Sequence, residues 1–273
     1  MGKKRGSHVD MLFFTLLRRQ SMKIKVFLAM TAFISSLVAL RSFVQNYNNF
    51  FVAAESVHAV GIIALIWKLT TRKTCSGLSL QTQELTALVL AVRICCRFEI
   101  GHNIHTFLDI ASLVSTAWVI YMMRFKLYVT YNQHLDRTPK ICLLIPCGIM
   151  AVLVYPNTSL PLYTKMMWAF GVYLEAIMVL PQLHMMQRTQ LIEPCTALYV
   201  FALGLSRFFG AAYWILRVYE STEAYLFLLG HGYLWVPMVL VAETVQTFIL
   251  SDFCYYYSKS VLNGNLLVRV PRV

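Results

Sequence analysis

Long apolar runs are the feature that most constrains the fold of this chain. A helix needs about 20 mostly apolar residues to cross the hydrocarbon core of a bilayer. Seven such candidate runs follow one another with short loops between them, which leave no room for a second folded domain. The sequence therefore predicts an all-α polytopic membrane protein with seven core transmembrane helices. The runs span residues 51–69, 84–101, 104–126, 140–156, 162–183, 197–218 and 225–257.

Composition supports lipid as the surrounding solvent. Of the 273 residues, 58% are hydrophobic and 13% are charged, whereas soluble domains average about 45–50% apolar and about 25% charged residues. The net charge of +12 does not indicate nucleic acid binding, because the basic residues lie at the ends of apolar runs. We therefore expect the lipid bilayer as a partner, and no nucleic acid.

Residues 1–48 form a basic extension that precedes the seven core candidates. Seven cations lie within residues 1–25, and an apolar segment follows at 26–44. Secretory signal peptides also place a basic region before an apolar one, but this segment begins far from the start and has no convincing small-residue cleavage site. An extra transmembrane or interfacial helix is the favoured alternative. The expected domains are this extension, a membrane domain at 49–258 and a cytoplasmic tail at 259–273.

The placement of Lys and Arg predicts the orientation of the chain. Cytoplasmic flanks of transmembrane helices carry an excess of both residues. If residues 1–25 are cytosolic and 26–44 crosses the membrane, most of the 24 Lys and Arg residues fall on cytosolic stretches. The expected lumenal turn at 219–223 carries Glu220 and Glu223 instead. This pattern places the C-terminus in the cytosol.

Charged residues inside the apolar runs are the candidate functional groups. A charge at bilayer depth costs on the order of 3 kcal/mol on insertion scales, so such residues face a polar cavity or each other. One interpretation is a pocket open to the lumen, whose arginines bind an anionic ligand. The alternative is internal salt bridges, such as Arg207 with Glu175, that hold the bundle together. The charged positions are Glu55, Arg93, Glu175, Arg207, Arg217 and Asp252.

His58 lies near Glu55 in the first run and also allows two interpretations. A lone histidine in a helix is more often a hydrogen-bonded packing residue. Beside a polar cavity, His58 could instead titrate between a neutral and a mildly acidic compartment. Residue types and spacing leave both roles open.

Several short strings then identify a family resemblance. From about residue 49 to 262 the chain resembles the KDEL receptor family, the ER lumen protein-retaining receptors. The order and spacing of the strings agree across all seven runs, apart from an expected insertion between the last two. The strings are IWK at 66–68, TCSGLS at 74–79, TAWVIY at 116–121, WAFGVYLE at 168–175, LPQL at 180–183, FALG at 201–204, WILR at 214–217, VQT at 245–247 and SDF at 251–253.

The resemblance implies a fold and a function. The family fold is similar to that of PQ-loop and SWEET transporters, with two three-helix repeats about a linking helix. Its members bind the C-terminal retrieval tetrapeptide (KDEL or HDEL type) of escaped ER proteins in the acidic Golgi and release it in the neutral ER. The implied site residues are Arg93 and Arg217 for ligand charge, Glu175, Trp168 and Arg207 in the pocket, His58 for the pH response, and Glu55, Asp252 and Gln246 at further polar family positions.

The chain also departs from the family pattern, so we expect a diverged, receptor-like member with weakened, altered or lost tetrapeptide binding. Phe51 replaces a family arginine, and phenylalanine cannot supply a bidentate contact. Residues 262–267 carry none of the tail lysines that family members use to recruit vesicle coats. In the pocket, Cys96 replaces an acid, Lys165 replaces an acid with a cation, Ser206 and Gly210 replace tyrosines, and Tyr213 replaces an asparagine.

Three functions remain after these observations. A sorting receptor of the ER and Golgi membranes is favoured, and it predicts that Arg93 and Arg217 converge on a lumenal pocket. A small-solute transporter of the PQ-loop or SWEET type predicts a site near the midplane that opens to either side. A trafficking factor with a vestigial pocket is the third. An enzyme is not expected, nor is a cofactor or metal, because no nucleophile–base pair and no Cys-x-x-Cys spacing occurs.

Overall fold

The computed structural model describes residues 48–100, 104–158, 160–189, 191–220, 234–262 and 268–269. The chain divides into two compact units, Met1–Tyr47 and Asn48–Val273. The expected helix at 26–44 falls in the first unit and lies outside the described residues.

Helices account for each of the seven predicted runs. The helices are α3 (Asn48–Trp67), α4 (Leu80–Ile100), α5 (Ile104–Tyr121), α6 (Ile141–Leu153), α7 (Leu162–Ile177), α8 (Leu180–Thr189), α9 (Pro194–Glu220) and α11 (Trp235–Leu262). Short π-helical turns, Lys68–Arg72 and Met122–Lys126, extend α3 and α5, and a 3₁₀ turn follows at Tyr128–Thr130. Five described helical segments are long and apolar enough to cross a membrane. The prediction of a multi-pass α-helical membrane protein is confirmed.

The fifth run is divided into two helices by its proline. Helix α7 ends at Ile177, and Pro181 lies in the first turn of α8, where a missing backbone N–H costs least. The next N–H, that of Gln182, donates to Thr82 Oγ1 on α4 at 3.0 Å. The side chain of Gln182 also donates to Gly77 O and accepts from Ser79 N. The neighbouring helix thus satisfies the backbone freed by the break.

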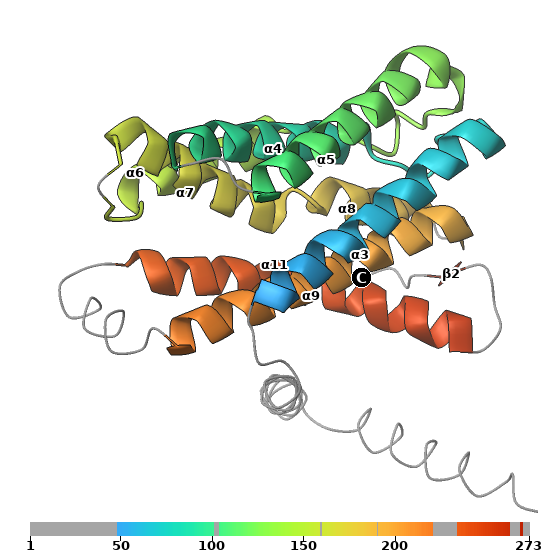
Figure 1. The fold of residues 1–273 in the computed structure, drawn as a ribbon. Coiled ribbons are helices and arrows are strands. Elements are labelled where there is room, and N and C mark those ends of the chain that lie inside the picture. The colour runs from blue at the N-terminus through green and yellow to red at the C-terminus, as the bar shows by residue number, and fades with distance from the viewer. Residues whose placement is uncertain are drawn as a thin grey trace, which may run out of the picture. The chain divides into compact units, whose positions relative to one another are not determined.

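The helices pack in a repeated pattern of pairs. Helix α3 lies against α9, and α4 lies against α7 (Figure 1). Helix α5 contacts α4 and α3, whereas α11 contacts α9 and α7. Helix α6 packs against α7. Each of the contacts made by α3, α4 and α5 therefore has a counterpart among the contacts made by α7, α9 and α11.

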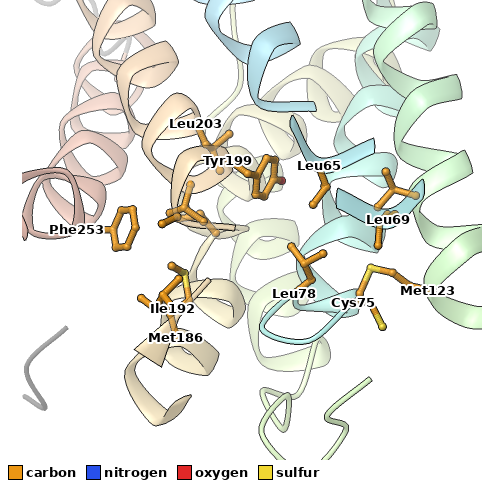
Figure 2. Close-up of a cluster of buried hydrophobic side chains, with 14 of the residues drawn as sticks. Leu65, Leu69, Cys75, Leu78, Met123, Met186, Ile192, Tyr199, Leu203 and Phe253 are labelled. Atoms are coloured by element: carbon orange, nitrogen blue, oxygen red, sulfur yellow. The ribbon is translucent and has the colours of Figure 1, made fainter. Parts of the chain in front are cut away.

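A buried hydrophobic cluster fills one end of the bundle. Figure 2 shows Leu65 from α3 together with Leu78, Met123 and Tyr199, which come from three other parts of the chain. Leu65 is 1% exposed and Leu69 is fully buried. Leu65 lies two helical turns from His58, about 10 Å along α3, so this apolar cluster lies to one side of the charged residues around His58.

The C-terminal residues return to the bundle. Strand β2 (Val268–Arg269) pairs antiparallel with β1 (Leu191–Ile192), which lies between α8 and α9. Helix α11 itself continues to Leu262. Part of the expected tail at 259–273 is therefore helix and strand.

Small residues allow α9 and α11 to approach closely, which gives a first testable prediction. A Cβ at Gly204 would lie 2.5 Å from Cys254 Sγ and 3.4 Å from Leu250 Cβ. We expect Gly204→Ala to lower the free energy of unfolding by about 1–2 kcal/mol, because an extra methyl must displace a packed helix. Thermal unfolding in detergent measures this effect. Adding Cys254→Ala should recover most of the loss, and a double variant no better than Gly204→Ala would contradict the proposed clash.

Candidate functional site

Arg93 on α4 is the centre of a charge cluster inside the bundle. Its Nη2 lies 3.5 Å from Glu55 Oε1 on α3 and 3.2 Å from Asp109 Oδ1 on α5. Its Nη1 donates to Glu175 Oε1 on α7 at 3.0 Å. Three helices therefore each direct a carboxylate at one guanidinium, which removes most of the cost of placing its charge in the bundle.

Glu175 joins two arginines. The same Oε1 that accepts from Arg93 also accepts from Arg207 Nη1 on α9. The backbone carbonyl of Glu175 accepts from Gln246 Nε2 on α11 at 2.9 Å. This carbonyl lies in the last turn of α7, where backbone oxygens lack helical partners. Gln246, which is buried, therefore holds the end of α7 that carries Glu175.

A polar cavity lies beside these groups. It has about 340 Å³ of empty space, including its open side, but little of that space is wide enough for a water molecule. His58 is buried at its wall, next to Arg93, Arg207 and Glu175. The remaining lining residues are Glu55, Thr86, Val89, Leu90, Met178 and Ser206.

Two acids near the cluster were missed by the sequence reasoning. Asp109 is almost fully buried and contacts Arg97 Nε through Oδ2 at 2.7 Å, in addition to Arg93. Glu243 on α11 has its Oε2 4.0 Å from where a Cβ at Gly210 would lie. Both are lone carboxylates in apolar runs, so the rule that singled out Glu175 would have found them.

Other implied site residues lie apart from the Arg93 contacts. The ring of Trp168 packs edge-on against Trp235 of α11, with centroids 6.2 Å apart. Asp252 is exposed on α11 and forms no ion pair with another described residue. Arg217 belongs to α9, but its side chain lies outside the described residues. The expected convergence of Arg93 and Arg217 therefore stays a prediction, whereas Arg93 and Arg207 do meet.

Several of the departures from the family pattern have structural counterparts. Phe51 and Tyr213 pack edge-on with their ring centroids 5.8 Å apart, so an aromatic pair occupies two positions that are polar in the family. Cys96 is buried and its Sγ lies 3.8 Å from Thr164 O. Ser206 lines the cavity. The residues expected to depart from the family pattern therefore lie on several helices.

A second polar cluster connects the loop between α5 and α6 to the start of α4. Asp136 is buried and accepts from Ser79 Oγ at 2.9 Å and from Tyr131 OH at 2.6 Å. Burial raises the pKa of the Tyr131 phenol, and the bond to Asp136 raises it further. Burial also raises the pKa of the nearby Cys75 thiol. Both groups therefore stay protonated near neutral pH, and the cluster is suited to holding the loop.

The long apolar helices and the buried charges define a multi-pass α-helical membrane protein with a polar site inside its bundle. A family model described as ER lumen protein retaining receptor matches residues 74–217. The chain belongs to this family, whose name describes receptors rather than enzymes.

Characterised relatives match along nearly their whole length. The Caenorhabditis elegans ER lumen protein-retaining receptor erd-2.2 is 34% identical over 225 residues, covering 82% of this chain and 99% of the relative. The Petunia hybrida ER lumen protein-retaining receptor is 32% identical, covering 81% of this chain and 98% of the relative. Receptor B of Arabidopsis thaliana shows the same identity and coverage. The similarity therefore extends over the membrane domain rather than over one motif.

Proposed function

We propose that this protein is a retrieval receptor of the ER and Golgi membranes that binds C-terminal peptides of lumenal proteins through their free carboxylate. The observation that carries the proposal is the meeting of Arg93 and Arg207 beside a polar cavity. Arginine guanidinium groups match carboxylates in shape as well as charge. The implied ligand groups are Arg93, Arg207, Arg217, Glu175 and Trp168, with Glu55 and Gln246 as supporting residues.

The ligand carboxylate would have to replace an internal one. Both Nη groups of Arg93 already contact acids, and Glu175 keeps Arg207 as a partner if it releases Arg93. The cavity is also too small for a tetrapeptide and must widen. Binding is therefore an exchange of carboxylates, which makes affinity sensitive to small changes in the charge of the site.

A proton on His58 would favour this exchange. The charged groups that surround His58 are Arg93 from α4, Arg207 from α9 and Glu175 from α7, together with Glu55 on its own helix. Protonated His58 adds a positive charge beside the two guanidiniums, and an entering carboxylate compensates it. The bound state then holds more protons than the free state, so binding strengthens as pH falls. This sign suits capture in an acidic compartment and release in a neutral one.

Removing the imidazole should abolish this pH dependence. For His58→Ala we expect peptide affinity to differ less than about twofold between about pH 5.5 and about pH 7.2, because the imidazole is the group proposed to gain the proton. Titrations of purified protein at both pH values measure it. His134, exposed in the loop before α6, supplies the matched control, and His134→Ala should keep the wild-type profile. An unchanged profile in His58→Ala would assign His58 to packing alone.

The test of the function itself compares two forms of one peptide. A tetrapeptide ending in Lys-Asp-Glu-Leu is titrated as the free acid and as the C-terminal amide. The free acid should bind more tightly by about tenfold or more, because only it offers a full carboxylate to arginine. Equal affinity of the two forms, or no binding of either, would remove the receptor proposal and leave the transporter and the trafficking factor as the alternatives.

We further propose the two-repeat arrangement of PQ-loop and SWEET proteins for the domain at 49–258. The helix pairs support it if α3, α4 and α5 form one repeat, α7–α8, α9 and α11 form the other, and α6 links them. The α3–α9 contact then corresponds to α7–α4, the α4–α5 contact to α9–α11, and the α3–α5 contact to α7–α11. This architecture also suits a transporter. The buried apolar cluster at Leu65 fills one end of the bundle, which suits a receptor with a single lumenal opening. Transport would need that cluster to open, and solute uptake into proteoliposomes tests it.

The orientation follows from the same proposal. A lumenal pocket at the Arg93 end places the Leu65 end, the residues after Leu262 and the C-terminus on the cytosolic side. Vesicle coats would then have to recognise a surface other than a tail lysine cluster, because residues 262–267 contain no lysine.

A further inference from the structure

Arg97 stands next to Arg93 on the same face of α4. The two are four residues apart, so their side chains are neighbours about 6 Å apart along the helix axis. Arg97 is nearer to Ile100, the end of α4 that the proposed orientation places toward the lumen. Its side chain is 24% exposed, compared with 23% for Arg93. A ligand approaching Arg93 from that end would pass Arg97 first.

The carboxylate of Asp109 contacts the Arg97 guanidinium on its Nε side. Its Oδ2 lies 2.7 Å from Arg97 Nε, while its Oδ1 lies 3.2 Å from Arg93 Nη2. The carboxylate side chain of Asp109 is only 2% exposed, so its position is set by α5 and the two arginines. One buried acid is therefore in ionic contact with two guanidiniums at the same time.

The outer edge of Arg97 remains available. Among the described residues, no hydrogen bond or ion pair involves its two Nη groups. A guanidinium whose acid partner lies at Nε still has its two Nη groups, a pair of parallel N–H donors that can bind a carboxylate bidentately.

We propose that Arg97 is a ligand-binding arginine of the same site, with Asp109 as the residue that positions it. The proposal rests on the proposed function and names one further carboxylate contact within it. The ligand class is a peptide with a free C-terminal carboxylate. Phe51 occupies the position of an arginine in the resembled family and packs on Tyr213. Arg97 supplies from α4 the second guanidinium that the first helix lacks.

The decisive measurement is the affinity ratio between the free-acid and amidated Lys-Asp-Glu-Leu peptides. Arg97→Gln should weaken binding of the free acid by about tenfold and change that of the amide by less than about twofold. Arg97→Lys keeps the charge but lacks the paired N–H donors, so its affinity for the free acid should lie between those of the wild type and Arg97→Gln. Arg124→Gln is the control, because Arg124 is 63% exposed at the far end of α5 and should leave the ratio unchanged.

The positioning role of Asp109 is tested by the same ratio. Asp109→Asn should lower it by about threefold or more, and Asp109→Glu should restore part of it, which a purely structural effect on both peptides would not do. Thermal unfolding of each variant identifies any that fail to fold. If Arg97→Gln does not fold, the affinity ratio of Arg97→Lys decides whether Arg97 binds the carboxylate. Loss of the ratio in Arg93→Ala with a wild-type ratio in Arg97→Gln and Arg97→Lys would overturn this inference alone. A wild-type protein that does not prefer the free acid would overturn it together with the proposed function.

Discussion

Replacing Arg93 by alanine is expected to weaken binding of the free-acid peptide by about a hundredfold. A carboxylate on a guanidinium gains charge-assisted hydrogen bonds of about 1.5–3 kcal/mol each, and about 2.7 kcal/mol corresponds to a hundredfold change in Kd. The loss should exceed that of Arg97→Gln, because Arg93 borders the cavity and Arg97 is not among its lining residues. Isothermal titration with purified receptor gives both constants under one condition.

The same substitution also changes the charge of the site, so it needs a matched control. Without Arg93, Glu55 loses its only cation among the described residues, whereas Glu175 keeps Arg207 and Asp109 keeps Arg97. Removing one member of a buried ion network is strongly destabilising. Arg93→Lys keeps the charge and should preserve the unfolding temperature while still lowering affinity. If Arg93→Ala unfolds normally and binds as the wild type does, the carboxylate-binding model fails.

The helices were predictable because bilayer depth imposes a length and a polarity on each segment. All seven runs coincide with helices, and Pro181 marks the division of the fifth. For the last run, α11 spans Trp235–Leu262, and the expected residues 225–233 lie outside the described residues. The helix breaks at 178–179 because Pro181 lacks a backbone N–H and its ring clashes with the preceding helical turn. The pairing of β1 with β2 had no signal, because two-residue strands carry no periodicity.

The site was only partly predictable. An ionisable residue in an apolar run is a functional candidate by itself, which identified Arg93, Glu175 and Arg207. The expected ion pair of Arg207 with Glu175 is present. The further contacts of Arg93 depend on how the faces of several helices are rotated, and a single sequence does not specify that rotation. Asp109 was missed partly because it was not considered among the charged residues of the apolar runs. It was also missed because its contacts with both Arg93 and Arg97 appear only in the folded bundle.

A buried lysine just after the other end of α3 is a second residue whose contacts the sequence did not predict. Lys68 was expected at a cytosolic membrane flank, where lysines are usually solvated. Its side chain is instead fully buried, and Nζ contacts Glu193 Oε2 at 2.8 Å, Ser76 O at 2.7 Å and Thr196 Oγ1 at 2.6 Å. These three acceptors use all three ammonium donors. The lysine therefore ties α3 to the loop before α4 and to the start of α9.

Replacing this lysine should produce the largest loss of stability among the variants considered. We expect Lys68→Met to lower the free energy of unfolding by about 3 kcal/mol, because it leaves Glu193 without its cation and two further acceptors without a donor. The cost stays below that of a fully buried pair, since the Glu193 side chain is 32% exposed and keeps some water. Thermal unfolding in detergent, without peptide, measures the change.

The double variant separates charge from hydrogen bonding. Adding Glu193→Gln removes the unpaired carboxylate, so Lys68→Met with Glu193→Gln should recover about half of the loss, the rest belonging to the oxygens of Ser76 and Thr196. Peptide affinity should change little in either variant, because Lys68 lies ten residues from His58, about 15 Å along the helix. A Lys68→Met protein as stable as the wild type would mean that the ammonium contributes no net stabilisation where α3 meets α9.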